Sequence, residues 1–456
     1  MRSFPSTPPS AAKPSPWNFP DTVVRQIANG IQVVVIRMPA LPIVSVRWCF
    51  VSGRLHEKSD CVGSGFLLQC MLRHGTEDLS SADFARHLDR RGIRLGTQVS
   101  VDSTVISVSA LREYLGEALS IANDVAFRPS LPAQALALER IRAIQAHQQA
   151  MGQVENMANV SLSRSMYGAH PYGIPTTTRS GLQSTGREEV RALHQQICDP
   201  SRALLLVVGD VHPDEVVDVI ARKVSAVSSD TRSTELIAPQ APTSCSDVVL
   251  IERPGAEQVV VGVGTLAMAR NHPEFLPLRV VNHVWGGGAS SRLFAQLRER
   301  QGLTYGAYSQ LDCGRWAGDL TASMTVAPQK LSHAVGSLAK EIDRIGTGEI
   351  TSSELKDSIH YLVGSFPQRA SGLAGVSSLT MAAWLHDLPS STWRDYQAAL
   401  QAITPDVVES TARSWIKPDR FSWIIAGSPE ALDEASGEIS ALQRPIRRMN
   451  MESMVD

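Results

Sequence analysis

Two residues with metal-binding side chains, Cys70 and His74, are four positions apart in the stretch GSGFLLQCMLRHGT, residues 63–76. Residues with this spacing share one face of a helix, and a thiolate and an imidazole are both common zinc ligands. His147 offers a third ligand farther along the chain. In the structural alternative, Cys70 is a small buried hydrophobe and His74 caps or leaves the helix. We favour that alternative, because such ligands without a general base or supporting polar groups rarely form a catalytic centre.

Other motifs that carry chemistry are missing. The six cysteines include no C-x-x-C pair, so neither a disulfide scaffold nor a cysteine-rich zinc site is indicated. No G-x-G-x-x-G follows an expected strand, which leaves dinucleotide binding without support. Glycines 286–288 precede Ser290 and Ser291, which are good helix caps, and the lysine of a phosphate-binding loop is absent. We therefore expect reduced thiols and no cofactor in this chain.

Charge and hydropathy exclude two kinds of partner. The 456 residues include 43 Lys and Arg and 45 Asp and Glu, with no basic cluster, whereas nucleic-acid binding needs clustered positive charge. No apolar run approaches the ~18 residues that span a bilayer, so no membrane partner is expected. The first 19 residues are rich in Pro and Ser and lack the apolar core of a signal peptide. They predict a disordered lead-in and a cytoplasmic protein, or a periplasmic one if a signal peptide has been removed.

The sequence repeats itself at an offset of 215–218 residues. DPSRALLLVVG at 199–209 corresponds to KPDRFSWIIAG at 417–427, and VVVIRMP at 33–39 corresponds to VVLIERP at 248–254. A third pair of blocks, at 111–125 and 328–342, keeps its matching apolar residues 216 apart. Three blocks in the same order at a nearly constant offset indicate a duplicated domain.

The duplication divides the chain into parts. Within each half, strands come first, then a helix, further strands, two helices, and a closing strand and helix. This order with antiparallel-type neighbours predicts an α+β fold, with two homologous α+β sandwich domains, and argues against a doubly wound parallel sheet. The expected parts are a lead-in (1–19), an N-terminal domain (20–227), a Ser-, Thr- and Pro-rich linker (228–245), a C-terminal domain (246–442) and a tail (443–456).

Three motifs carry a resemblance to a known family. They are the stretch at 63–76, YGAHPYG at 167–173, and GGGASSRLFAQLRERQGLTYG at 286–306. With the duplicated domain, they resemble the insulinase-like (pitrilysin-type) zinc peptidases, in particular the bacterial two-subunit branch related to the mitochondrial processing peptidase. The resemblance runs from about residue 22 to residue 442. It implies two domains that form half of a clamshell around a closed chamber.

The zinc site of that family is altered in this sequence. In the family, an inverted H-x-x-E-H helix binds zinc through two His, and its Glu is the general base. Alignment on residues 71–76 puts Phe66, Gln69 and Cys70 in those three slots. Phe offers no lone pair, Gln cannot accept a proton from water, and one Cys alone makes no site. The third ligand, a Glu expected near position 145, is also missing, and the segment offers Gln145, His147 and Gln148. The resemblance therefore implies a degenerate zinc site without metal.

The second half retains the family's other catalytic pair. Family members carry an Arg and a Tyr seven residues apart, and LRERQGLTY supplies Arg298 and Tyr305. Such a pair would stabilise the negative charge that develops on the peptide carbonyl oxygen, and the Arg would also hold substrate carbonyls. From periodicity alone, Arg298 is a charge on a solvated helix face and Tyr305 a strand-core aromatic. The family spacing favours the catalytic interpretation, with weaker claims for Arg292 and Arg300.

The retained and missing residues together imply a divided active site. In two-subunit members, one chain carries H-x-x-E-H and the other carries Arg/Tyr. The resemblance thus implies the non-zinc-binding subunit of a heterodimeric metallopeptidase, inactive alone, whose H-x-x-E-H-bearing homologous partner holds the zinc and whose substrates are peptides or unfolded polypeptides. The alternative is a catalytically inert structural or peptide-binding subunit, like the core proteins of respiratory complexes. A stand-alone peptidase with an unusual metal site, built from Cys70, His74 and His147, ranks last.

Overall fold

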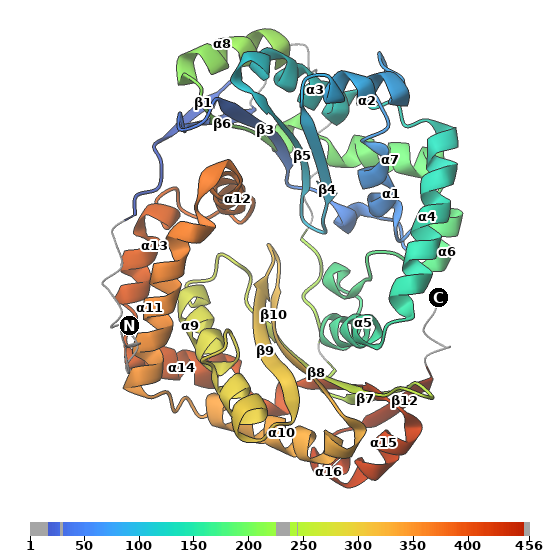
Figure 1. Cartoon of the computed structure of the whole chain (residues 1–456), viewed down its shortest axis with the longest axis vertical. Helices are drawn as coiled ribbons and strands as arrows, with labels where there is room; N and C mark the ends of the chain where they lie inside the picture. Colours follow the sequence, from blue (N-terminus) through green and yellow to red (C-terminus); the bar gives the residue numbers. More distant parts are fainter. Residues whose placement is uncertain (1–16, 28–30, 225–237, 244, 451–456) are drawn as a thin grey trace, which may run out of the picture.

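The structure is a computed structural model that describes residues 17–27, 31–224, 238–243 and 245–450. Two halves, at the top and bottom of Figure 1, are each built on a six-stranded sheet. The first sheet has the order β1-β2-β6-β3-β5-β4 and the second β12-β7-β11-β8-β10-β9. The strands are β1 (Thr22–Gln26), β2 (Gln32–Arg37), β3 (Ile43–Phe50), β4 (Arg94–Val99), β5 (Thr104–Leu111), β6 (Ala203–Gly209), β7 (Val248–Glu252), β8 (Val259–Ala267), β9 (Thr304–Cys313), β10 (Gly318–Val326), β11 (Ser422–Gly427) and β12 (Ile446–Asn450).

The two sheets have equivalent pairings. In each, one parallel pair (β2 with β6, β7 with β11) leads into an antiparallel series that ends at an edge strand, β4 or β9. The exception is the other edge, where β1 pairs antiparallel with β2 but β12 pairs parallel with β7. The prediction of two homologous α+β domains is confirmed.

Helices fill the connections between the strands. In the first half they are α1 (Ser64–Met71), α2 (Ser81–Asp89), α3 (Leu115–Phe127), α4 (Ala133–Met151), α5 (Val154–Tyr167), α6 (Arg179–Ser184), α7 (Arg187–Ile197) and α8 (Pro213–Val224). In the second half they are α9 (Phe275–Trp285), the π-helix η5 (Phe294–Arg300), α10 (Leu331–Gly346), α11 (Ser352–Arg369), α12 (Gly372–Leu385), α13 (Thr392–Gln401), α14 (Pro405–Trp415), α15 (Pro429–Glu434) and α16 (Ser436–Ala441). Among the described residues, none of these helices has both the length and the apolar composition needed to cross a membrane.

The central strands are buried on both faces. All residues of β6 and β11 are buried, and both strands are nearly continuous apolar runs, as expected where each face is covered. β5 instead alternates buried and partly exposed residues, which is the pattern of a strand with one covered face. The covering helices therefore have to reach both faces of the middle of each sheet but only one face near β4 and β9.

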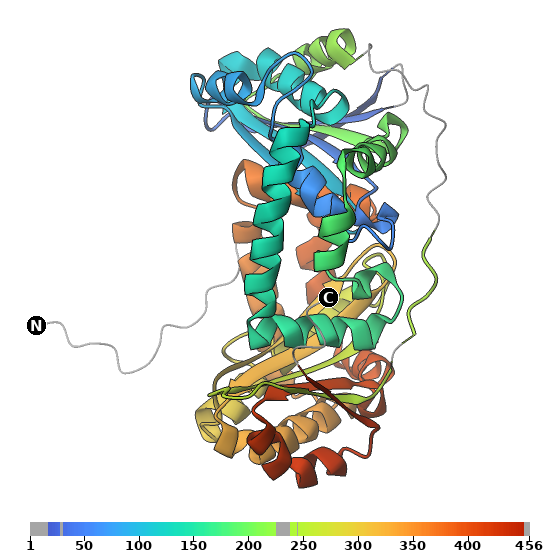
Figure 2. The same ribbon diagram turned by 90° about the vertical axis from the view of Figure 1, so that its right-hand side faces the viewer.

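Each half covers its sheet partly with a helix from the other half. The long helix α4 runs along the side of the molecule toward the second half, and α5 follows it there (Figure 2). Met157, Leu162 and Met166 of α5 pack against Val260 of β8 and Ile424 of β11. In return, α12 of the second half lies on the first sheet. Its residues form a cluster with β2, β3 and β6 that includes Val34, Ile36, Cys49, Leu204, Leu206, Val208 and Val376.

The turns of the two edge hairpins meet between the halves. The carboxylate of Asp102, between β4 and β5, accepts a hydrogen bond from the Tyr172 hydroxyl. The same oxygen accepts from the backbone N–H of Arg315, between β9 and β10, at 3.0 Å. The backbone N–H of Trp316 donates to the Tyr172 hydroxyl at 3.2 Å. These bonds fix the β9–β10 hairpin relative to the first half.

The ends of the predicted domains differ from the packed units. Trp17 and Phe19 lie in the predicted lead-in but pack on the second-half core, where Trp17 contacts Phe366 edge-on with ring centroids 5.3 Å apart. β12 lies in the predicted tail but belongs to the second sheet. Residues 1–16 of the lead-in, 225–237 and 244 in and around the linker, and 451–456 of the tail lie outside the described residues.

Candidate functional site

Helix α1, where the zinc residues of the resemblance would lie, is formed as predicted. Its N-terminus is bound by the carboxylate of Glu57, which accepts the backbone N–H of Gly65 at 2.7 Å and that of Gly63 at 3.2 Å. A carboxylate is stabilising at this end of a helix, because the first N–H groups have no partner within the helix. The chain leaves the helix through Gly75, whose φ of 101° is accessible to glycine at little cost.

The residues in the former zinc slots are used for packing and hydrogen bonding. Phe66 packs against the first-half core. The side-chain oxygen of Gln69 accepts the backbone N–H of Val99 at 2.9 Å, and its backbone oxygen accepts the Thr97 hydroxyl at 2.8 Å. Both partners lie on β4. The Gln69 side chain, at the position of the family's general base, thus connects α1 to the edge strand of the sheet.

The third slot holds a poor metal ligand. Burial raises the pKa of the Cys70 thiol, and the nearby charge of Glu139 raises it further. A thiol with a raised pKa is largely protonated near neutral pH, whereas the thiolate is the form that binds zinc. His74 has a partner already, since its Nε2 lies 3.2 Å from Glu139 Oε1, an oxygen that also accepts a hydrogen bond from Arg142 at 2.8 Å.

The metal site considered from Cys70, His74 and His147 is not formed. His147 lies eight residues beyond Glu139 on α4, about 12 Å along the helix axis. Its Nδ1 is 3.0 Å from the Thr177 hydroxyl. Within the described part of the chain, no three His, Cys, Asp or Glu side chains are grouped to hold a metal ion. Phe66, Gln69 and Cys70 therefore do not fit zinc.

Arg298 lies on the surface of the second half, in the π-helix η5. Its guanidinium stacks on the ring of Phe294, 4.4 Å from the centroid, and that ring contacts Tyr308 with centroids 5.5 Å apart. Phe294 is buried and Arg298 is exposed. Stacking restrains the guanidinium and leaves its N–H groups free to bind carbonyl or carboxylate oxygens.

Tyr305 is 93% exposed although it lies within strand β9. A β-bulge accounts for its direction. Thr304 pairs with Val326 and Ala307 pairs with Met324, so β9 contains one extra residue between these pairs. The Thr304 hydroxyl accepts the N–H of Gly306 at 3.2 Å and donates to the carbonyl of Thr325 at 2.7 Å. The exposure excludes the alternative that Tyr305 is a strand-core aromatic.

The first half contains the same segment without these irregularities. SSADFARHLDRRGIRLG at 80–96 matches SSRLFAQLRERQGLTYG at 290–306 at an offset of 210. Leu88 and Leu95 stand where the second half has Arg298 and Tyr305. Both leucines pack against the first-half core, in an α-helix and in a strand with uninterrupted pairing. π-Turns and bulges are both frequent beside functional sites, where they redirect side chains.

Comparison with known proteins agrees with these motifs. A family model described as "Insulinase (Peptidase family M16)" matches residues 32–179, and one described as "Peptidase M16 inactive domain" matches residues 185–362. The chain belongs to the insulinase-like peptidase family.

Its relatives include proteins with contrasting names. The "Uncharacterized zinc protease YmxG" of Bacillus subtilis is 25% identical over 338 residues, which cover 74% of this chain and 81% of the relative. The "Non-peptidase homolog YmxG" of Helicobacter pylori is 21% identical over 331 residues, covering 72% and 76%.

Two solved structures share the fold. The peptidase M16 inactive domain from Pseudomonas fluorescens superposes with a TM-score of 0.83 at 21% identity, over 90% of this chain and 98% of that one. A protease from Helicobacter pylori gives a TM-score of 0.81 at 17% identity, over 90% and 100%.

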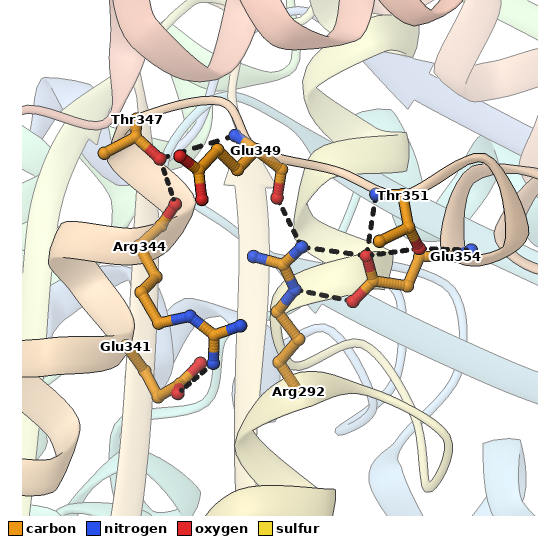
Figure 3. A network of polar contacts seen from close by, with 7 residues as sticks. All are labelled: Arg292, Glu341, Arg344, Thr347, Glu349, Thr351 and Glu354. Carbon is orange, nitrogen blue, oxygen red and sulfur yellow. Dashed lines mark hydrogen bonds and ion pairs between the residues drawn. The ribbon is translucent and has the colours of Figure 1, made fainter.

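Arg292, in the Gly-rich block at 286–306 that also contains Arg298 and Tyr305, is structural in this insulinase-like chain (Figure 3). The guanidinium of Arg292 is buried and forms two hydrogen bonds to the Glu354 carboxylate, at 2.7 and 2.8 Å, and one to the backbone oxygen of Glu349. Burial raises the pKa of Glu354, but hydrogen bonds from Arg292 and Thr351 outweigh it and lower the pKa to about 2. The ion pair joins the start of η5 to the N-terminus of α11.

The YGAHPYG motif of the family is also structural in this chain. The Tyr167 hydroxyl donates to Asp319 of β10 at 2.7 Å, and the Tyr172 hydroxyl donates to Asp102. His170 is buried, and its Nδ1 accepts the backbone N–H of Tyr172 at 3.1 Å. The motif thus holds the two halves together, and His170 packs within it.

Proposed function

We propose that this chain is the non-zinc-binding subunit of a heterodimeric insulinase-like metallopeptidase. Alone it would cleave no peptide. Arg298 and Tyr305 would contribute to a catalytic site whose zinc and general base belong to an H-x-x-E-H-bearing homologous partner. The observation that carries the proposal is the exposure of Tyr305, which a bulge turns out of a strand whose counterpart in the first half points Leu95 into the core.

The chemistry of the two side chains matches this role. When water attacks a peptide carbonyl, negative charge develops on the carbonyl oxygen. The Tyr305 hydroxyl would donate a hydrogen bond to that oxygen, an interaction that strengthens as the charge grows and therefore lowers the barrier. The stacked guanidinium of Arg298 would bind the same oxygen or neighbouring substrate carbonyls through its forked donors.

The state of helix α1 supports the need for a partner. Phe66 and Gln69 have packing and hydrogen-bonding roles, and the pKa of the Cys70 thiol is raised, so no zinc ligand set remains in this chain. The family includes relatives named as zinc proteases and one named as a non-peptidase homolog, so chains with and without such a site would both be present among them.

The test is reconstitution with a homologous chain from the same organism that carries H-x-x-E-H. The two chains should co-purify and cleave a fluorogenic peptide, while this chain alone should not. Tyr305→Phe should lower turnover by ~10²–10³, about 3–4 kcal/mol, because it removes one donor to the developing charge. The Michaelis constant should change little. Arg298→Ala should also raise the Michaelis constant, since the guanidinium would contact bound substrate.

A matched control is Tyr361→Phe, which removes the hydroxyl of another exposed tyrosine in the same half. It should leave turnover unchanged, and the zinc content of the complex should be the same in all variants. Full turnover of the Tyr305→Phe complex would instead assign the chain to the structural or peptide-binding class. Failure of the two chains to associate would reject the heterodimer itself.

A further inference from the structure

Two arginines of the second half lie on a floor of aromatic rings. The guanidinium of Arg270 is 3.7 Å from the centroid of the Phe275 ring and 5.8 Å from that of Trp393. The guanidinium of Arg279 is 6.0 Å from the centroid of Tyr396, and the Trp393 and Tyr396 centroids are 5.9 Å apart. The two guanidiniums therefore lie over neighbouring rings of one aromatic cluster.

More basic groups surround this floor. The backbone N–H of Arg270 donates to Gly314 at 2.9 Å, which brings it beside Arg315. The side chain of Arg315 donates to the backbone oxygen of Leu385 and, at 2.7 Å, to the carboxylate of Asp387, on either side of His386. Arg369 ends α11, three residues beyond Phe366, whose ring centroid is 4.3 Å from that of Tyr396. Burial is the main cause that lowers the pKa of Arg270 and Arg279, and the charge of Arg369 lowers both further.

These cations lack the partners that arginines usually have. Among the described residues, Arg270, Arg279 and Arg369 take part in no ion pair and no side-chain hydrogen bond. Burial, with the neighbouring charge of Arg279, lowers the pKa of Arg270 to about 10, so the group stays charged at neutral pH. Two positive charges that are partly buried next to each other destabilise the fold unless an anion compensates them.

Buried polar atoms at the same place also lack partners in the described structure. They are the hydroxyl of Tyr396, which is 2% exposed, Nδ1 of His386 and Nε of Arg315. A buried polar atom without a hydrogen bond is uncommon and often marks the place of an absent water or ion. The orphaned atoms and the uncompensated charges thus indicate a negatively charged ligand.

We propose that Arg270, Arg279 and Arg369 bind an oxyanion, with Tyr396 and His386 as neutral hydrogen-bonding groups around it. Carboxylates and phosphates both fit, because their oxygens accept the paired N–H donors of guanidinium groups. The two sources are an acidic peptide and free phosphate. The stacked rings hold the arginines in place and leave their N–H edges for the ligand. The site depends neither on the partner subunit nor on zinc.

The test is titration calorimetry of the purified chain at constant ionic strength, with inorganic phosphate and with a short poly-glutamate peptide as probes. Arg270→Gln should weaken binding about 10- to 100-fold, the effect of losing one charge-assisted hydrogen bond. Arg369→Gln should weaken binding in the same direction, and this exposed residue can be changed without disturbing the core. Arg394→Gln, which removes an exposed charge from α13 beside Trp393, is the matched control and should bind as the wild type does.

The two probes separate the two sources. Binding of the peptide with the same dependence on Arg270 and Arg369 identifies a peptide carboxylate as the ligand, whereas binding of phosphate alone identifies a free anion. The proposal is overturned if neither probe binds the wild-type chain. It is also overturned if Arg270→Gln and Arg369→Gln, each shown to be folded by circular dichroism, bind as tightly as Arg394→Gln.

Discussion

Helix α1 of the first half and the η5–β9 segment of the second half are both family motifs, but they have been put to different uses. In α1, Gln69 is hydrogen-bonded to β4, Phe66 packs on the core, and burial raises the pKa of the Cys70 thiol. In η5–β9, Arg298 and Tyr305 are exposed and flanked by a π-helix and a bulge. The residues at the former zinc positions of α1 now contribute to packing and hydrogen bonding. The exposure of Arg298 and Tyr305 is not explained by packing, and it is consistent with a role in binding or catalysis.

The contrast extends to the two copies of the same repeat. Leu88 and Leu95 pack against the first-half core, whereas Arg298 and Tyr305, at the equivalent positions, are exposed. The second-half segment packs on its core through other residues, among them Leu297 and Leu303. The ion pair of Arg292 with Glu354 adds a polar anchor just before the π-helix.

The largest effect on stability is expected at Arg292. Arg292→Met should destabilise the chain by about 3 kcal/mol, because it removes one partner of a largely buried, bidentate ion pair. Urea unfolding followed by circular dichroism measures the change. Arg300→Met, at an exposed position of the same π-helix, is the control and should stay within about 0.5 kcal/mol of the wild type. If the two substitutions changed the free energy of unfolding equally, the Arg292–Glu354 ion pair would not be a main stabilising contact.

The two copies of the repeat should respond differently to truncation. Leu95→Ala should cost about 2 kcal/mol, the low end for leucines in cores, because Leu95 is partly buried against the first-half core. Tyr305→Ala should change the free energy of unfolding by less than about 0.5 kcal/mol, because the side chain is almost fully exposed. A large loss of stability in Tyr305→Ala would mean that the tyrosine is structural after all, and the comparison would fail.

A smaller effect is expected in helix α1. Gln69→Ala should cost about 1 kcal/mol or slightly more, since the N–H of Val99 loses its hydrogen-bond acceptor. Gln69→Glu restores the residue type of the general base and keeps an acceptor for that N–H, so its cost should be less. Metal analysis after incubation with zinc should find none retained in either variant. Stoichiometric zinc in Gln69→Glu would contradict the conclusion that α1 holds no metal site.

The last effect concerns pH and is seen only in acid. The pKa of Glu354 is about 2 in the folded chain, below its ordinary value of 4.5. A carboxyl whose pKa is lower in the folded state stabilises fully above its unfolded pKa, and this contribution is lost as pH falls through the folded value. The stability difference between wild type and Glu354→Gln should therefore be constant near neutral pH and shrink below about pH 4. Urea unfolding across this range measures it, and a difference independent of pH would contradict the lowered pKa.

The duplication, the α+β class and the altered zinc helix could be predicted from the sequence, because they depend on local patterns and on matching blocks. The exchange of α5 and α12 could not, because the apolar residues of a helix do not reveal which of two similar sheets they cover. The bulge at Tyr305 was hidden for a related reason. It exists only in the pairing of β9 with β10, and the residues of β9 alone predict a regular strand with Tyr305 on its buried face.

The exchange of helices has a consequence during synthesis. The first sheet is complete in sequence once β6 has been made, but α12, which covers one face of it, ends roughly 175 residues later, on the order of 10–30 s at ordinary translation rates. For that interval the apolar side chains of Val34, Leu204 and Leu206 have no cover from α12. A nascent chain with such a face is a substrate for chaperones and a risk for aggregation. The first half therefore cannot complete the packing of its sheet until α12 of the second half has been synthesised.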